Sequence, residues 1–408
     1  MMTKFPQIKI YRTQLIKTTG LCLHVLIIFI KRFINFEIYL IRSGRVGHLA
    51  INTEWFLRKR NYKGLVIKPY TIIISPKVKK NMYVANVYLL KEYVKELQKD
   101  CRIFTIESSI LHRVMHSIKI INHRQKKNYY LPSNHIMNND FSKTQKVINL
   151  SNNDISRGRV LLKNLGVTEF DRIVVIFARD SEYLSKRFTD KDWSYHDYRN
   201  ADIGTYIKSI NYLIEIGYTV IRVGSVVKDK VNFNHPKFID YPFSSCKSDF
   251  LDVLIIYLSK FVIGTTSGAT DMALTFNKPF LGVNYAPFTE SPLGRFDQYI
   301  QKKLVDNESK MVIKYKDFLG KECLSEVYNS KEFSKKYNLS YKDNTEDEIL
   351  DAVIEFENRN RQLSFTESNK CSDLLNKYNS MYWKHMPSHL IEPKISCSWL
   401  KKHIDLYT

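Results

Sequence analysis

Apolar runs and amphipathic stretches alternate through the middle of the chain. The apolar runs are short, rich in Val, Ile and Phe, and bounded by polar or turn residues, a pattern typical of buried strands. They lie at residues 172–179, 218–224, 238–242, 261–264 and 280–284. The stretches with helical periodicity lie at residues 205–216, 249–258 and 269–276. Because strands and helices alternate at this spacing, we predict a parallel, doubly wound sheet.

The N-terminal part of the chain repeats this pattern in a shorter form. Strands are predicted at 37–42 and 71–75, and helices at about 49–58 and at 85–97. The polar region 122–153 is interpreted as loops and a linker. A strand, a glycine-containing loop and a helix in succession are typical of the opening of an α/β domain.

The length of the chain, 408 residues, favours two domains over one. We predict two Rossmann-like α/β domains followed by a helical tail that carries Trp383 and Trp399. The expected boundaries are 1–35 for an N-terminal segment, 36–165 and 166–343 for the two domains, and 344–408 for the tail.

The chain carries 63 Lys and Arg residues against 41 Asp and Glu residues, a net charge of +22. Such an excess favours anionic partners, namely nucleic acid, an anionic membrane surface or phosphorylated substrates. No nucleic-acid partner is expected, because no basic block lies within a known nucleic-acid-binding motif. The alternative is a lysine-rich composition that only solvates the surface.

The segment 21–30, LCLHVLIIFI, is apolar and has Lys17 before it and Lys31 and Arg32 after it. It is shorter than the roughly 17–25 residues that a spanning helix needs, and it lacks the cleavage site of a secretory signal. Two interpretations remain, an interfacial helix that docks on a membrane with a basic rim and a buried N-terminal helix. The flanking cations favour the first interpretation.

Six cysteines are scattered along the chain without a CxxC pair. This spacing favours a reducing cytosol and argues against a disulfide framework or a zinc site. The six are Cys22, Cys101, Cys246, Cys323, Cys371 and Cys397.

The most informative motif is FVIGTTSGATDMALTFNKPFLGVNY, at 261–285. It predicts a strand, a polar turn at 265–268, a helix with Thr266 or Ser267 at its N-cap, and a second strand. Free N–H groups and the positive end of the helix dipole, at Ser267 and Gly268, suit a phosphate group. The alternative is an ordinary capped βαβ unit with no ligand.

Other polar residues follow the neighbouring predicted strands. Because the carboxyl ends of parallel strands meet at one edge of a sheet, we expect these residues near the turn at 265–268. Arginine is the residue that binds phosphate in a bidentate manner. The alternative for Arg179 is a structural pair with Asp180 or another nearby carboxylate, and a structural role is also the alternative for Arg222, which lies within a predicted strand. The candidates for binding a donor diphosphate are Arg179, Asp180, Arg222, Gly224, Asp240, Thr266, Ser267 and Gly268.

The segment 190–206, DKDWSYHDYRNADIGTY, is too long for a simple connection and is therefore a candidate functional loop. Within it, Arg199 either faces the donor or locks the loop. Asp190 and Asp192 form a DxD tripeptide, which holds a divalent cation in metal-dependent sugar transferases. The tripeptide is common by chance, so no metal site is predicted.

A second candidate loop lies in the N-terminal domain and contains Gly44, Arg45, Gly47 and His48. Histidine titrates near neutral pH, so His48 is a candidate general base toward an acceptor hydroxyl. A structural or solvated histidine is the alternative. The glycine spacing here is neither GxGxxG nor a Walker motif.

Several segments together resemble bacterial surface-carbohydrate glycosyltransferases of the GT-B type, which occur with capsule and lipopolysaccharide genes. The segments are IRSGRVGHLAINTEWFLR, VANVYLLK, FARDSEY, HDYRNADIGTYIKSINYLIEIGYTVIRVGS, DFLDVLIIYLSKFVIGTTSGA and KPFLGVNYAP. The resemblance implies two facing Rossmann-like domains with a cleft between them, the N-terminal one binding the acceptor and the C-terminal one a nucleotide sugar. It implies no metal and no cofactor.

The resemblance implies transfer of a sugar from a nucleoside-diphosphate sugar to a hydroxyl of a surface glycan, expected to be lipid-linked. His48, Arg179 and Arg199 are the expected catalytic residues. The protein is expected in the cytoplasm, peripheral at the anionic inner membrane. Two alternatives stay open: a non-enzymatic, membrane-associated anion-binding protein, and a two-Rossmann transferase that moves a pyruvyl or phosphoalditol group.

Overall fold

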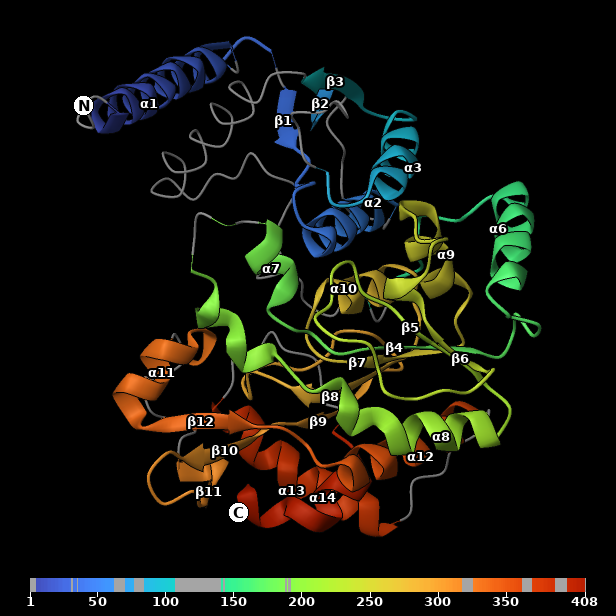
Figure 1. Cartoon of the computed structure of the whole chain (residues 1–408). Coiled ribbons are helices and arrows are strands. Elements are labelled where there is room, and N and C mark those ends of the chain that lie inside the picture. Colours follow the sequence, from blue (N-terminus) through green and yellow to red (C-terminus); the bar gives the residue numbers. More distant parts are fainter. Residues whose placement is uncertain are drawn as a thin grey trace. The chain divides into compact units, whose positions relative to one another are not determined.

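The computed structural model shows an α/β protein with parallel sheets, as the pattern predicts (Figure 1). It describes residues 5–30, 32–34, 36–61, 70–76, 84–106, 141, 144–187, 189, 192–317, 326–361, 369–385 and 395–407. The chain forms two compact units. The first comprises Met1–Met137 and Thr144–Asn149, and the second comprises Asn138–Lys143 and Leu150–Thr408. Each unit is described by itself, so the facing arrangement and the exact domain boundaries stay predictions.

The first unit is built on a three-stranded parallel sheet in the order β1-β2-β3. Its strands are β1 (Phe36–Leu40), β2 (Tyr70–Pro76) and β3 (Arg102–Ile106). Its helices are α1 (Phe5–Ile30), the π-helical turn η1 (His48–Asn52), α2 (Thr53–Asn61) and α3 (Val87–Leu97). The two strands and two helices predicted in this part of the chain are confirmed, whereas β3 was not predicted. Most of the region 122–153 lies outside the described residues.

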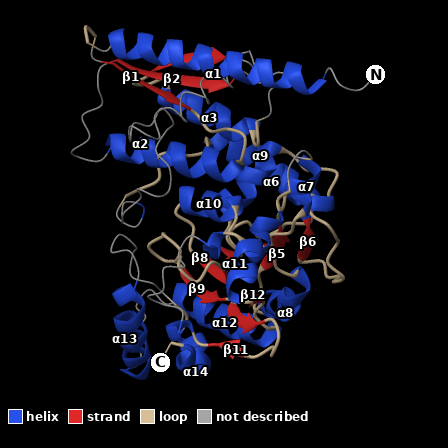
Figure 2. Ribbon diagram, turned by 90° about the vertical axis from the view of Figure 1, so that its left-hand side faces the viewer, coloured by secondary structure: helices blue, strands red, loops and turns tan. Residues whose placement is uncertain are grey.

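Helix α1 packs along this sheet (Figure 2). The side chains on its two faces differ in burial. Its buried face contributes Ile27, which packs with Phe36, Leu40 and Ile106 of the sheet. Its other face exposes large apolar side chains, namely Leu15, Leu21, Val25, Leu26, Ile28 and Phe29. No helix in the described part of the chain is long and apolar enough to cross a membrane. One side of α1 is therefore buried against the sheet, and membrane docking by the other side stays a prediction.

The second unit contains a six-stranded parallel sheet in the order β6-β5-β4-β7-β8-β9. The strands are β4 (Ile173–Phe177), β5 (Thr219–Arg222), β6 (Phe238–Asp240), β7 (Phe261–Gly264), β8 (Phe280–Tyr285) and β9 (Gln298–Gln301). The chain runs outward from β4 to β6 and then returns to place β7 on the other side of β4. The switch in strand order therefore lies between β4 and β7.

Helices connect these strands, and the three predicted between residues 205 and 276 are confirmed. The helices and turns up to β8 are α6 (Asn152–Asn164), α7 (Glu182–Arg187), η3 (Ser194–Arg199), η4 (Ile203–Tyr206), α8 (Ile207–Glu215), η5 (Tyr241–Phe243), α9 (Asp249–Leu258) and α10 (Gly268–Thr275). Helix α9 is largely buried and begins where Ser248 caps the N–H of Leu251.

The region after β8 adds elements that the pattern did not predict. A small antiparallel sheet has the order β11-β10-β12. Its strands are β10 (Lys303–Asp306), β11 (Val312–Ile313) and β12 (Leu339–Lys342). The helices and turns of this region are η6 (Tyr315–Asp317), η7 (Glu326–Tyr328) and α11 (Ser330–Tyr337). These strands are short and mix charged with apolar residues, so they lack the apolar run that identified the central strands.

The predicted helical tail is confirmed in its secondary structure. It contains α12 (Glu346–Arg361), α13 (Asn369–His385), α14 (Cys397–His403) and η8 (Ile404–Leu406). Just before α14, Ile395 pairs in parallel with Tyr299 of β9. The tail is therefore part of the second unit. Trp399 is 2% exposed and donates from its indole N–H to Tyr407.

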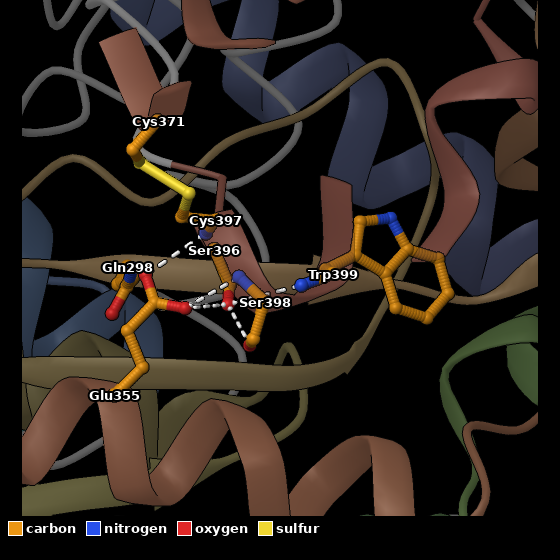
Figure 3. Close-up of a disulfide and its surroundings, with 7 residues drawn as sticks. All are labelled: Gln298, Glu355, Cys371, Ser396, Cys397, Ser398 and Trp399. Atoms are coloured by element: carbon orange, nitrogen blue, oxygen red, sulfur yellow. Dashed lines mark hydrogen bonds between the residues drawn. A yellow bond between two sulfur atoms is a disulfide. The ribbon is translucent and has the colours of Figure 1, made fainter. Parts of the chain in front are cut away.

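The expectation that the cysteines form no disulfide is wrong. Cys371 in the first turn of α13 and Cys397 at the start of α14 are joined by a disulfide, with their Cα atoms 5.8 Å apart (Figure 3). Their separation of 26 residues along the chain has no recognisable spacing, and only the packing of α13 against α14 brings them together. Among the described cysteines, Cys22, Cys101 and Cys246 are free. Cys323 lies outside the described residues.

Candidate functional site at the strand-order switch

The carboxyl ends of β4 and β7 lie side by side at the switch in strand order. The backbone N–H of Arg179, just after β4, donates to Thr265 Oγ1, just after β7, over 3.0 Å. Gly264 permits this close approach, because a Cβ atom there would lie 2.5 Å from the carbonyl oxygen of Phe177. Ligands of doubly wound sheets bind outside the carboxyl ends of the strands at such a point. The sequence therefore placed Arg179 and the turn at 265–268 together correctly.

Helix α10 begins at this point with a closed set of side-chain hydrogen bonds. Ser267 Oγ accepts from the N–H of Ala269 (3.2 Å), and Thr270 Oγ1 accepts from the N–H of Ser267 (3.3 Å). Thr266 Oγ1 donates to the carbonyl oxygen of Ala286 over 2.8 Å. The hydroxyls of Thr266 and Ser267 are thus used by the fold itself. What the turn offers an anion is the first-turn backbone, chiefly the N–H of Gly268, and the helix dipole.

Arg179 has one anchored nitrogen and one open edge. Its Nη1 atom donates to the carbonyl oxygen of His196 over 3.2 Å and to Oδ1 of Asn200. In the described part of the chain, no acceptor is found for its Nε and Nη2 atoms, which form the edge that binds phosphate through two parallel hydrogen bonds. Burial and the charge of Arg199 lower the pKa of Arg179 to about 10, so the guanidinium stays charged at neutral pH.

Arg199 ends the turn η3 and brings a second guanidinium to this place. Its charge acts on Arg179, Asp271 and Glu290. The Nε atom of Arg199 is buried without an acceptor among the described residues, and its guanidinium carbon lies 5.4 Å from the ring centre of Tyr198. Its predicted catalytic role and the alternative of a loop lock both stay open.

Two acidic residues at this site were missed by the sequence reasoning. Burial raises the pKa of Asp271, in the first turn of α10, to about 7; Arg199 opposes this shift and Glu290 adds to it. Burial also raises the pKa of Glu290, against the effect of Arg199 and a hydrogen bond with Tyr328. Asp271 stands inside the 261–285 motif, where an acid in the first turn of the helix was a usable signal. Glu290 follows β8 through a loop that carries no motif.

Three other predicted donor-binding residues have partners inside the fold. Arg222 is 2% exposed, and its Nη1 atom lies 3.3 Å from both carboxylate oxygens of Asp240 and 2.8 Å from the carbonyl oxygen of Asp229. Asp180 accepts from the N–H groups of Glu182 (3.0 Å) and Lys228 (2.9 Å). These contacts favour structural roles for Arg222, Asp240 and Asp180. Their donor-binding role stays a prediction.

Gly224, the remaining candidate beside β5, also has contacts within the second unit. Its carbonyl oxygen accepts from Lys247 Nζ over 2.8 Å. A Cβ atom at Gly224 would lie 2.5 Å from a methyl group of Val227, so the position requires a small residue. Its contact with a donor stays a prediction.

The predicted acceptor-side residues belong to the first unit. Gly44 is exposed, Gly47 is buried, and His48 is the first residue of the π-helical turn η1. The carbonyl oxygen of Arg45 accepts from the N–H of Leu49 over 3.0 Å. The turn η1 runs directly into α2. Single π-helical turns joined to α-helices are frequent at functional sites, but this observation assigns no role to the loop.

The DxD tripeptide is described only in part. Asp190 lies outside the described residues, whereas Asp192 pairs with Lys331 and accepts from the N–H of Ser194 over 2.9 Å. No group of three or more His, Cys, Asp or Glu residues suited to a metal ion is found within the described ranges.

Comparison with known proteins gives a likeness at the level of structure only. No protein-family model and no curated protein matches the chain. A family 9 glycosyl transferase from Veillonella parvula DSM 2008 is similar with a TM-score of 0.43 and 10% identity, over 79% of this chain and 97% of that one. The Escherichia coli ADP-heptose lipopolysaccharide heptosyltransferase II is similar with a TM-score of 0.39 and 10% identity, over 65% and 90%. Likeness of this degree identifies neither a substrate nor a reaction.

Proposed function

We propose that the second unit binds the diphosphate of a nucleoside-diphosphate sugar at the switch between β4 and β7. The observation that carries this proposal is the state of Arg179. Its Nη1 atom is anchored to His196 and Asn200, its Nε–Nη2 edge is open, and its backbone N–H donates to Thr265, just before the start of α10. A fixed guanidinium, together with the N–H of Gly268 and the positive end of the α10 dipole, is suited to a diphosphate.

The proposed reaction is transfer of the sugar to a hydroxyl group of a surface glycan. The bond between the anomeric carbon and the diphosphate oxygen breaks, and negative charge develops on the leaving diphosphate. Arg179, Arg199 and the N–H of Gly268 stabilise that charge. Two guanidinium groups and a helix N-terminus supply the positive charge, so the proposal includes no metal and no cofactor.

The acceptor belongs to the first unit in this proposal. His48, beside Gly44, Arg45 and Gly47, takes the proton from the attacking hydroxyl as a general base. The exposed apolar face of α1 and the net charge of +22 hold the protein at an anionic inner-membrane surface, where lipid-linked glycans are found.

The test is a thermal-shift screen with UDP-glucose, GDP-mannose, ADP-glucose and dTDP-glucose, with the free nucleosides as controls. We expect at least one nucleotide sugar to raise the melting temperature. The Arg179→Ala variant should stay folded and bind that sugar about 10- to 100-fold more weakly, because a charge-assisted hydrogen bond is lost. Lys186→Ala removes an exposed cation of α7 and should leave binding unchanged.

Two results would contradict the proposal. One is the absence of stabilisation by every nucleotide sugar and by pyrophosphate. The other is a folded Arg179→Ala variant with the affinity of the wild-type protein, which would remove this residue from the site.

A further inference from the structure

A buried lysine contacts the segment of chain that follows η3. Lys302 follows β9, is 2% exposed, and forms an ion pair with Asp343 at 2.7 Å. Burial lowers the pKa of Lys302, and Asp343 opposes this effect. Lys302 Nζ also donates to the backbone carbonyl of Asn200, in the segment between η3 and η4. Sequence reasoning did not single out Lys302, Asp343 or Asn200 as site residues.

The ion pair holds this segment at two points. Lys302 binds the carbonyl oxygen of Asn200, and Asp343 Oδ2 accepts from the N–H of Asp202 over 3.2 Å. Between them, the N–H of Ala201 donates to the carbonyl oxygen of Arg179 over 2.9 Å. The backbone of residues 200–202 is therefore fixed to the end of β4 on one side and to the ion pair on the other.

The side chain of Asn200 connects this fixed backbone to the guanidinium of Arg179. Its Oδ1 atom accepts from Arg179 Nη1, and its Nδ2 atom donates to Asp197 Oδ1 over 2.8 Å. The second acceptor for Nη1, the carbonyl oxygen of His196, lies in η3, directly before this segment. Thus one contact that orients Arg179 comes from the segment that Lys302 and Asp343 hold, and the other comes from the turn that leads into it.

We propose that Asn200 and the Lys302–Asp343 pair are positioning residues that present the Nε–Nη2 edge of Arg179 to the donor diphosphate. This inference rests on the proposed function. A buried ion pair is often no more stabilising than apolar residues of the same volume, so stability alone accounts poorly for a lysine at this place.

The experiment is a double-mutant cycle on pyrophosphate binding, measured by isothermal titration calorimetry. The variants are Asn200→Ala, Arg179→Ala and the two combined, each checked for folding by circular dichroism. Because Asn200 acts through Arg179, we expect Asn200→Ala to weaken binding about 5- to 20-fold alone and to add nothing to Arg179→Ala. If the two residues acted independently, the fold-losses of affinity in the single variants would multiply in the double variant.

The ion pair is tested by Lys302→Met combined with Asp343→Asn, which leaves no unpaired buried charge. This variant should also weaken pyrophosphate binding in the wild-type background but not in the Arg179→Ala background. It serves as the second test if Asn200→Ala fails to fold. Lys331→Met, which removes the exposed contact with Asp192 near the same turn, is the matched control and should bind normally.

The outcomes separate this inference from the proposed function. Wild-type protein that binds neither pyrophosphate nor any nucleotide sugar contradicts the proposed function itself. Two results overturn the positioning role alone, provided that the wild-type protein binds normally. In one, the losses of affinity multiply in the double variants. In the other, Asn200→Ala and Lys302→Met/Asp343→Asn keep the full affinity.

Discussion

Asp271 has a carboxyl group whose charge changes near neutral pH. It lies in the first turn of α10, and burial raises its pKa to about 7. The charged groups that act on it are Arg199 of η3, which favours the ionised form, and Glu290 of the loop after β8, which opposes it. A diphosphate bound at the start of α10 adds further negative charge and so favours the protonated carboxyl group.

We therefore predict that anion binding weakens as the pH rises. Below about pH 7 Asp271 is neutral and does not repel the diphosphate; above it, the ionised carboxylate does. The affinity for a bound nucleotide sugar, whose diphosphate does not titrate in this range, should fall up to about tenfold between pH 6 and pH 8. Titration calorimetry of the wild-type protein and Asp271→Asn measures this.

Asp271→Asn should bind with the low-pH affinity at every pH in this range. Asp154→Asn, which changes an acid in the first turn of α6, is the control and should keep the wild-type pH dependence. A wild-type affinity that does not change with pH, or an unchanged dependence in Asp271→Asn, would contradict this role for Asp271.

At the scale of elements, Glu355 of α12 joins the tail helix α14 to the main sheet (Figure 3). Its carboxylate accepts from the N–H groups of Cys397 (2.9 Å) and Ser398 (2.6 Å) and from Ser396 Oγ (2.7 Å). It also accepts from Gln298 Nε2 of β9. One acid thus satisfies the first N–H groups of α14 and complements its dipole.

Removing this carboxylate should destabilise the second unit. For Glu355→Ala, we predict a loss of about 2–4 kcal/mol in the free energy of unfolding, since several buried donors lose their acceptor. Urea unfolding followed by tryptophan fluorescence and circular dichroism measures the loss. Asp351→Ala, on the same helix, breaks only the exposed pair with Lys402 and should cost less than about 1 kcal/mol. Equal effects of the two substitutions would contradict the role of Glu355.

Some strands could be predicted from the sequence and others could not. The strands β4 and β7 are continuous apolar runs buried on both faces, β8 is apolar apart from Asn284, and such runs are visible in the sequence. Strand β9, QYIQ, was missed because its ends are glutamines; Gln301 is nevertheless fully buried and donates to the carbonyl oxygen of Phe288 over 3.0 Å. Buried polar residues satisfied by distant partners leave no local pattern.

The sequence predicts which residues of the candidate site lie at the ends of neighbouring strands. It does not predict which side chains then pair with one another. The proximity of Arg179 to the turn at 265–268 follows from strand order alone. Strand order also brings Arg222 and Asp240 together, although it does not show that they pair with each other. The contact of Lys302 with the segment at 200–202 joins residues about a hundred positions apart along the chain. No spacing rule identifies such contacts.

At the scale of the whole molecule, two features support the proposed binding to a membrane surface. The net charge is +22, and α1 exposes an apolar face that includes Val25 (58%), Leu26 (51%) and Phe29 (58%). The opposite side of the same helix holds Ile27 in the core of the first unit. Deleting α1 would therefore also disturb that core, and point substitutions on the exposed face are the cleaner test.

We predict that Val25→Ser combined with Phe29→Ser abolishes most binding to phosphatidylglycerol vesicles and leaves the fold intact. Exposed apolar side chains are lost while Ile27 stays in place. Vesicle co-sedimentation measures the effect, and binding of the wild-type protein should also weaken at high salt. Val160→Ser, at an exposed apolar position of α6, should bind as the wild type does. Equal binding of all three proteins would show that α1 is not the docking surface.

A crystal structure with the nucleotide sugar that stabilises the protein most would locate the diphosphate directly. We expect the diphosphate between the Nε–Nη2 edge of Arg179 and the N–H of Gly268, with Nη1 of Arg179 still bound to Asn200. A diphosphate bound in the first unit, or in the second unit without contact to Arg179 and α10, would contradict this account.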